Sequence, residues 1–268
     1  MPVHAQTISN ILVMGKSGAG KQPRIDVLVK EFGLKQLSTG NMFRSYLKKF
    51  NEIEYEGDFR EFYDEPNRTF LPDAEILSKL GPVAEWDDPE GVLLGLKAKF
   101  FVESGKFVPD LITNAMFEAE FVKVGCTGLI MDGFPRTVVQ SELLLDLVIR
   151  YGTNIDAIVL VDGDDDQIVN RTIGRRICPH CKKVYHMEYK PPRDGQFCTA
   201  CGTKVITRVD DKEEKIRSRL EEFHSKAAPA IKLMKSRGIP VAVVPGNLPV
   251  FTEELVRESV MEALDKIF

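Results

Sequence analysis

The sequence predicts an α/β fold with a parallel sheet, and two patterns support this prediction. Short apolar runs, bounded by Gly, Asp, Ser or Pro, lack the alternation of a sheet with one face in water. Such runs are typical of strands buried on both faces. Stretches with apolar residues three and four positions apart lie between strands, as amphipathic helices do. In such folds the ligand binds beyond the carboxyl ends of the strands.

Five strands are expected in chain order, at Ile11–Met14, Lys35–Leu37, Leu129–Met131, Ala157–Val161 and Val241–Val244. The clearest helical spacing covers Lys212–Arg237 and Thr252–Phe268. Two segments break this alternation. Residues 177–206 are rich in Gly, Pro and Cys and predict a small turn-rich subdomain. Residues 50–90 combine acidic and aromatic side chains, which is too aromatic for a disordered linker, so we expect an insertion that packs on something.

Composition excludes several functional classes. The 268 residues, 43% of them apolar, are enough for a full core. A net charge of −4 gives no support for binding to nucleic acid or to a membrane surface. The chain has no apolar run of about eighteen residues, and its N-terminus does not resemble a secretory signal. Four of the five cysteines have metal-site spacing, which suits the reducing cytoplasm.

The segment Gly15–Lys21 follows the first strand and matches the Gly-x-x-x-x-Gly-Lys loop. In that loop, backbone N–H groups wrap a phosphate and the Lys contacts the outer phosphates. The usual Ser or Thr after the Lys is replaced by Gln22-Pro23, which removes the hydroxyl that contacts Mg²⁺. Arg24 is a candidate source of compensating positive charge. An ordinary strand-to-helix glycine turn is the alternative for this loop alone, and Lys16 is similar to the extra Lys of the MinD/ParA class of ATPases.

Four cysteines form two close pairs, Cys178 with Cys181 and Cys198 with Cys201. Two Cys-x-x-Cys units predict a tetrahedral zinc site, with Zn–S bonds of about 2.3 Å. His180 is left out because four thiolates already fill the tetrahedron. The fifth cysteine, Cys126, is interpreted as a small buried hydrophobe.

Three motifs carry a family resemblance. Leu37–Arg44 resembles the Leu-Ser-Thr-Gly-Asp-Met-x-Arg segment of adenylate kinases, with Asn41 where that family has Asp. Asp132–Thr137 with Gln140 is similar to the family's Asp-Gly-Phe-Pro-Arg-Thr-x-x-Gln, and Gly105–Asp110 to Gly-Lys-Leu-Val-x-Asp. Together with the arginine-flanked cysteine flap they cover most of the chain in order, so the chain is identified as a long-form adenylate kinase with a zinc-containing lid.

The resemblance implies residue roles. Those implied for AMP are Thr39, Arg44, Lys106, Phe107, Val108, Gly133, Arg136, Gln140, Arg208 and Arg219. Those implied for ATP are Gly18, Ala19, Gly20, Lys21, Gln22, Arg171, Val184, Tyr185 and Leu248. The implied catalytic cations are Lys21, Arg136, Arg171, Arg175, Arg208 and Arg219, and Asp132 would position magnesium through water. Asp210 and Asp211 would either orient the lid arginines or touch substrate.

The resemblance also implies a P-loop kinase fold of three parts. The core would contain 1–37, 117–173 and 212–268, the NMP-binding arm 38–116 with the insertion at about 50–90, and the zinc lid 174–211. The implied reaction is reversible, magnesium-dependent transfer of the ATP terminal phosphoryl to AMP, giving two ADP. Alternatives are a broader nucleoside monophosphate kinase (GTP:AMP or UMP/CMP) and a catalytically weak nucleotide-binding regulator; a nucleic-acid-binding zinc ribbon does not fit the acidic balance. The chain would be a monomer or an oligomer formed through the insertion, and exposed aromatics favour the oligomer.

Overall fold

The computed structural model describes residues 8–104, 106–181, 183–188, 190–207, 211–248 and 250–268. Its centre is a five-stranded parallel sheet with the order β2-β5-β1-β6-β9. These strands are β1 (Asn10–Gly15), β2 (Lys35–Ser38), β5 (Leu129–Asp132), β6 (Ala157–Asp162) and β9 (Val241–Pro245). The predicted fold class and all five strand positions are confirmed, with each strand extending up to one residue further at its ends.

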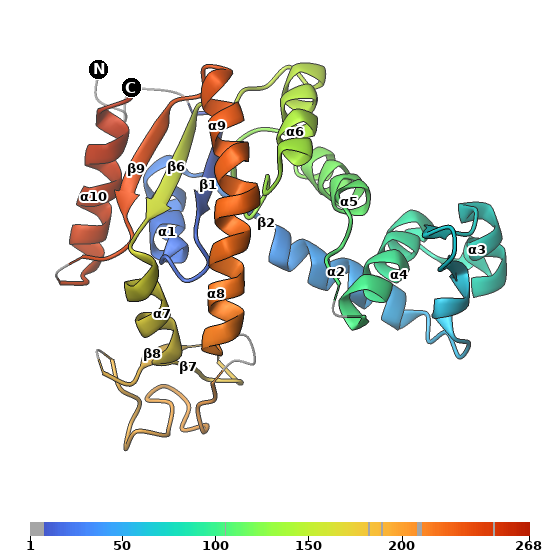
Figure 1. The fold of residues 1–268 in the computed structure, drawn as a ribbon, viewed down its shortest axis with the longest axis horizontal. Coiled ribbons are helices and arrows are strands. Elements are labelled where there is room, and N and C mark those ends of the chain that lie inside the picture. Colours follow the sequence, from blue (N-terminus) through green and yellow to red (C-terminus); the bar gives the residue numbers. More distant parts are fainter. Residues whose placement is uncertain (1–7, 105, 182, 189, 208–210, 249) are drawn as a thin grey trace.

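Helices cover both faces of the sheet. Alternate residues of a strand point to opposite faces, and because both sets are apolar here, each face is covered by helices. In β1, Leu12 and Met14 pack in a cluster with α6 (Val138–Arg150) and α9 (Ala228–Ser236). Ile11 and Val13 pack in a second cluster with α1 (Lys21–Phe32) and α10 (Glu253–Asp265). Figure 1 shows these helices around the sheet. Among the described helices, none is both long enough and apolar enough to cross a bilayer.

The helix predicted at 212–237 is present, but it is not uniform. It begins as α8 (Glu213–Glu222), passes through a π-helical turn (Phe223–Ala227) and continues as α9. Pro229 follows this turn and has no N–H to donate to the turn before it, and π-turns of this kind occur where a helix is locally rearranged. The result is a long rod that runs from the sheet past the cavity described below (Figure 1).

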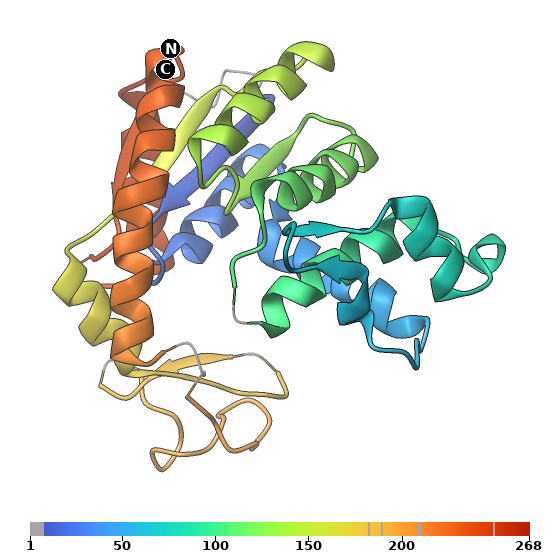
Figure 2. The ribbon, with the colours of Figure 1, turned by 45° about the vertical axis from the view of Figure 1, so that its right-hand side comes forward.

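Two parts project from the sheet layer, and both lie on the side of the strands' carboxyl ends (Figures 1 and 2). One is built from α2 (Thr39–Glu52), α4 (Pro89–Glu103) and α5 (Asp110–Lys123). The other lies beyond α7 (Asp165–Ile173) and contains the hairpin of β7 (Arg175–Ile177) and β8 (Val184–His186).

The insertion forms a small packed unit on α4. It contains the turn Phe59–Phe62, the hairpin β3 (Tyr63–Asp64) and β4 (Thr69–Phe70), α3 (Asp73–Leu80) and the turn Val83–Glu85. Its aromatic rings face inward: Phe62 is 2% exposed, and Tyr63 stacks on Phe100 at 4.2 Å between ring centroids. The expectation of packing is therefore confirmed. The assumption that these rings are exposed is wrong, because α4 supplies aromatic partners that lie further along the chain.

Candidate active site

The Gly-rich loop between β1 and α1 curls around the side chain of Lys21. Gly18 has φ of +86°, and a Cβ there would lie 2.6 Å from Thr172 Oγ1, so the close approach requires glycine. The Lys21 ammonium donates hydrogen bonds to the carbonyls of Gly15 (2.9 Å) and Lys16 (3.0 Å). Burial lowers the pKa of Lys21 to about 8, although Asp132 nearby raises it. This geometry is that of a loop whose backbone can surround an anion next to a lysine.

Lys16 points away from this loop. Its ammonium donates to the Gly163 carbonyl at 2.8 Å and pairs with Asp165 at 2.8 Å, at the start of α7. The side chain therefore ties β1 to the segment after β6. Lys16 is also not among the residues that line the large cavity described below.

Arg24 is completely buried, and its guanidinium donates to the carbonyls of Gly20 (3.2 Å) and Pro245 (2.6 Å). The interpretation of Arg24 as a charge that compensates at the phosphates is wrong, because these carbonyls turn it toward the end of β9. Burial, with a smaller contribution from Arg171, lowers the pKa of Arg24 to about 10. Arg24 thus holds the loop after β9 against the start of α1.

Arg171, on α7, joins the two loops expected to take ATP. One guanidinium nitrogen donates to the Gly246 carbonyl (3.0 Å) and to Asn247 Oδ1 (2.5 Å), and the other donates to the Gly18 carbonyl. Leu248 follows in the same loop and is partly buried. The guanidinium therefore lies between the Gly-rich loop and the turn after β9.

Tyr185 does not face a nucleotide with its ring. The side chain is 2% exposed, and the hydroxyl donates to Cys198 Sγ at 3.1 Å while accepting from the Thr199 N–H at 2.8 Å. Only the backbone of β8 is available for the contact implied by the resemblance, together with half-exposed Val184.

A smaller cavity of about 270 Å³ lies between α2, α5 and the loop after β5. It is lined by seven of the residues expected to hold AMP: Thr39, Lys106, Phe107, Val108, Gly133, Arg136 and Gln140. Gln140 is held at both ends of its amide, because its oxygen accepts from the Arg136 N–H (2.7 Å) and its nitrogen donates to Asp110 (2.7 Å). Arg44 is exposed and bonded to Asn41 at 2.5 Å, outside the cavity lining.

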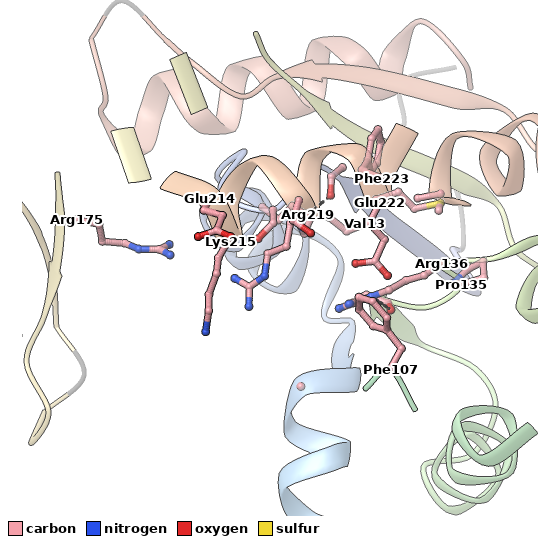
Figure 3. Close-up of a pocket in the computed structure, with 18 residues that line it drawn as sticks. Val13, Phe107, Pro135, Arg136, Arg175, Glu214, Lys215, Arg219, Glu222 and Phe223 are labelled. Atoms are coloured by element: carbon pink, nitrogen blue, oxygen red, sulfur yellow. Dashed lines mark hydrogen bonds between the residues drawn. The ribbon is translucent and has the colours of Figure 1, made fainter. Parts of the chain in front are cut away.

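A larger cavity of about 850 Å³ lies between the Gly-rich loop, α8 and the lid hairpin. Four of the six predicted catalytic cations line it, namely Lys21, Arg136, Arg175 and Arg219. In Figure 3 the head groups of Arg175, Arg219 and Arg136 face one space from three different elements. Arg171 lies behind the Gly-rich loop instead. Arg208 and Asp210 lie outside the described residues.

The sequence interpretation missed residues on the same face of α8. Lys215 and Glu222 line the cavity together with Arg219. The spacing 215, 219 and 222 is that of one helix face, so helical periodicity read from Arg219 finds both. Lys226 was also missed: its ammonium lies 4.5 Å from the ring centre of Phe107 and connects the π-turn to the α4–α5 loop.

The four cysteines form a cluster of metal-ligand type. Their sulfur atoms all lie within 4.8 Å of one another, and Sγ–Sγ distances of 3.4 Å separate Cys178 from Cys201 and Cys181 from Cys198. A tetrahedron of Zn–S bonds needs about 3.8 Å between sulfurs, so the thiols fit such an ion with small shifts. The hydrogen bond from Tyr185 lowers the pKa of the Cys198 thiol to about 7, which favours the thiolate that a metal requires.

The sequence of the chain matches the family model described as adenylate kinase over residues 87–239. The chain belongs to the adenylate kinase family. A curated adenylate kinase of Symbiobacterium thermophilum is 32% identical over 90% of this chain and 92% of its own length. Those of Caldicellulosiruptor saccharolyticus and Bacillus subtilis are each 30% identical, over 87% and 85% of this chain and 90% and 87% of their own lengths. The family and its phosphotransferase activity, as the sequence motifs predicted, are thereby confirmed.

Proposed function

We propose that this chain transfers the terminal phosphoryl group of MgATP to AMP, reversibly, and that two ADP are the products. The convergence of Lys21, Arg136, Arg175 and Arg219 on one cavity supports this most directly. Phosphoryl transfer through a loose transition state requires alignment and neutralised charge more than a base. Arginine forks and a lysine around a site for two phosphate chains supply both.

The two cavities suit one nucleotide each. Gly133, Arg136 and Phe107 line both of them, so a phosphate donor and an acceptor would meet beside Arg136. ATP would lie along the Gly-rich loop, with its base near Arg171 and the turn at Gly246. AMP would enter the smaller cavity, where Thr39 and the held amide of Gln140 present polar atoms to a base.

Magnesium would enter with ATP at the end of β5. The residues present suit it, because the Asp132 carboxylate supplies oxygen atoms of the kind that hard cations prefer, and Gln36 holds one of these oxygens by a hydrogen bond. When bound, the ion neutralises charge on the phosphate oxygens. Asp132 would hold its water shell at the Gly-rich loop.

Zinc is the ion proposed for the four cysteines, with a structural role. Among the lid residues that the structure describes, the apolar cluster is small and consists of Cys178, Tyr185, Cys198 and Val205. So little apolar surface does not hold a flap of this size together, whereas a tetrahedral thiolate site does. The reducing cytoplasm is the compartment proposed, because the thiols stay available there.

Both projecting parts would move during the reaction. The lid, at 174–211, would bring Arg175 onto the phosphates, and the NMP-binding arm, at 38–116, would close over AMP. Closure would exclude water and so prevent hydrolysis of ATP. The contact of Phe107 with Lys226 links the arm to the core at its moving edge.

A matrix of nucleotide donors and acceptors tests the proposal. The expected result is fast ADP formation from ATP and AMP, with slower turnover for UMP and CMP as acceptors. Transfer to UMP or CMP at the rate for AMP supports the broader kinase instead. If the purified protein binds a dinucleoside pentaphosphate but turns over no donor–acceptor pair, the result supports the nucleotide-binding regulator. If it binds that compound no more tightly than adenosine, the result contradicts a site for two nucleotides.

A further inference from the structure

A chain of hydrogen-bonded amides lies where the Gly-rich loop lacks its usual hydroxyl. Gln22, in the first turn of α1, and Gln36, on β2, exchange two hydrogen bonds, of 3.2 and 3.3 Å between amide nitrogen and oxygen. Gln36 Nε2 also donates to Asp132 Oδ2 at 3.1 Å. At the other end, Gln22 Nε2 donates to Asp26 Oδ1 at 2.9 Å. Four side chains therefore connect the start of α1 to the end of β5.

The backbone fixes this arrangement. Strand β2 pairs with β5, and Ser38 lies opposite Asp132, so Gln36 is two residues earlier on the neighbouring strand. Its long side chain reaches forward to the carboxylate and across to the first turn of α1. The Asp132 carboxylate lies close enough to Lys21 to raise the lysine pKa against the effect of burial. The amide chain thus ends beside the loop that takes the phosphates.

The chemistry of an amide suits this position. Gln36 Nε2 donates a hydrogen bond to Oδ2 of the Asp132 carboxylate. Among the described residues, no other side chain donates a hydrogen bond to this carboxylate. The other oxygen stays available for a metal-bound water. Gln22 holds the Gln36 amide in place, because its oxygen accepts from Gln36 Nε2 and its nitrogen donates to Gln36 Oε1. A threonine in place of Gln22 is too short to reach Gln36.

We propose that Gln22 and Gln36 act as a unit that positions Asp132 for the water shell of ATP-bound magnesium. Both glutamines are positioning residues, since they act through Asp132. The inference rests on the proposed function, because it needs MgATP at the Gly-rich loop. It deepens that proposal by naming what fixes the metal's carboxylate in this chain.

Titration calorimetry tests the inference without turnover. The quantity measured is the ratio of the dissociation constants for ATP without and with magnesium, in wild type, Gln22→Ala and Gln36→Ala. Loss of residues behind a metal's ligands typically costs about 10- to 100-fold in affinity, so we expect this ratio to fall about tenfold in each variant. Affinity for metal-free ATP stays within about twofold of wild type in Gln36→Ala, since the Gln36 amide bonds Gln22 and Asp132 and is not among the residues expected to hold ATP. Gln196→Ala, in the lid, is the control and leaves the ratio unchanged.

Two further variants separate a unit from two independent contacts. In the Gln22→Ala/Gln36→Ala double variant the ratio falls no further than in the worse single variant, because each substitution already breaks the same series of hydrogen bonds. Gln22→Thr, whose side chain is too short to reach Gln36, lowers the ratio as much as Gln22→Ala does. The inference is overturned if Gln36→Ala leaves the ratio unchanged, or if the reductions in the ratio multiply in the double variant. Wild type that binds a dinucleoside pentaphosphate tightly but shows no magnesium effect overturns it and leaves the proposed function standing; failure to bind that compound removes both.

Discussion

Arg175 and Asp211 form a two-point ion pair at the root of the lid. Arg175 Nε lies 2.9 Å from Asp211 Oδ2, and Nη2 lies 2.6 Å from Oδ1. The Asp211 side chain is 0% exposed and that of Arg175 27% exposed. Of the two roles open to Asp211 from the sequence, orientation of a lid arginine is the one the contact supports. The pair connects β7 to Asp211, two residues before α8 begins, so the direction of Arg175 depends on a carboxylate outside the hairpin.

We expect Asp211→Asn to destabilise the protein and to slow turnover. Removal of one partner leaves a guanidinium without its fork at a largely buried position, which costs about 3 kcal/mol in the free energy of unfolding. Urea unfolding measures this cost. Glu213→Gln is the control, because it breaks an exposed pair with Arg217 and costs under about 0.5 kcal/mol. Equal costs for the two variants contradict a structural role for the Arg175 pair.

Arg219 and Arg217 lie on the same helix and differ in what they face. Arg219 lines the large cavity, whereas Arg217 is about half-exposed and pairs with Glu213 and Asp166. We expect Arg219→Ala to lower kcat about 10³-fold, because an arginine on the transferring phosphoryl group contributes that much or more. Arg217→Ala stays within about threefold, as exposed pairs contribute little. Steady-state kinetics with ATP and AMP decide, and similar rates for the two variants rule out a phosphate role for Arg219.

The lid should contain one zinc ion per chain, with the Tyr185 hydroxyl as part of its surroundings. Cys181→Ser should reduce the zinc content and lower the melting temperature of the lid. Tyr185→Phe removes the donor to Cys198 and should weaken zinc binding about tenfold in competition with a chelator. Cys126→Ala and Tyr151→Phe are the matched controls, because neither residue belongs to the cysteine cluster or to the lid. Zinc affinity that is unchanged in Tyr185→Phe contradicts the role of the hydroxyl.

Above neutral pH, the protein should take up a proton at Lys21 when it binds a nucleotide. The pKa of Lys21 is about 8 in the free protein, so its charge is lost as the pH rises through that value. A bound phosphate favours the charged form and raises this pKa, hence the proton enters on binding and ATP affinity falls above pH 8. Calorimetry at pH 8.5 in buffers of different ionisation enthalpy measures the uptake, which should vanish at pH 6.5. Lys21→Met should show none at either pH; equal uptake in that variant assigns the proton to another group.

The aromatic insertion should leave the chain a monomer. Phe59 and Phe62 are buried within one chain, so the rings do not require a partner to cover them. Light scattering should therefore give the mass of one chain. A dimer would contradict this expectation. If Arg68→Glu, at an exposed position of the insertion, dissociates that dimer while Phe59 and Phe62 are intact, another face of the insertion forms the interface.

Local signals in the sequence predicted much of the fold. All five strands were predicted within a residue at their ends. Apolar runs indicate β1, β5, β6 and β9 because helices cover both faces of the sheet, whereas edge strand β2 buries only Leu37. The spacing of the cysteines predicted a cluster that the folded lid brings together. The glycine pattern predicted the loop around Lys21, since Gly18 has a backbone conformation that other residues rarely adopt.

The direction of long side chains was not predictable in this way. Arg24, Lys16 and Tyr185 follow or lie within binding motifs, yet each faces another part of the fold: the carbonyls after β9, the start of α7 and a lid thiol. These partners are 13, 147 and 221 residues distant along the chain, and a buried donor takes whichever acceptor the fold brings within reach.

The sequence by itself determined the sheet, the Gly-rich loop, the metal-type cysteine pairs and the family to which the chain belongs. These depend on residue type and short spacing, which are visible along the chain. Only the tertiary structure decided which cations share a cavity, that the insertion covers its own rings, and that Gln36 connects Gln22 to Asp132. Those relationships depend on contacts between distant segments, and a buried polar or aromatic group takes the partner that the fold brings within reach.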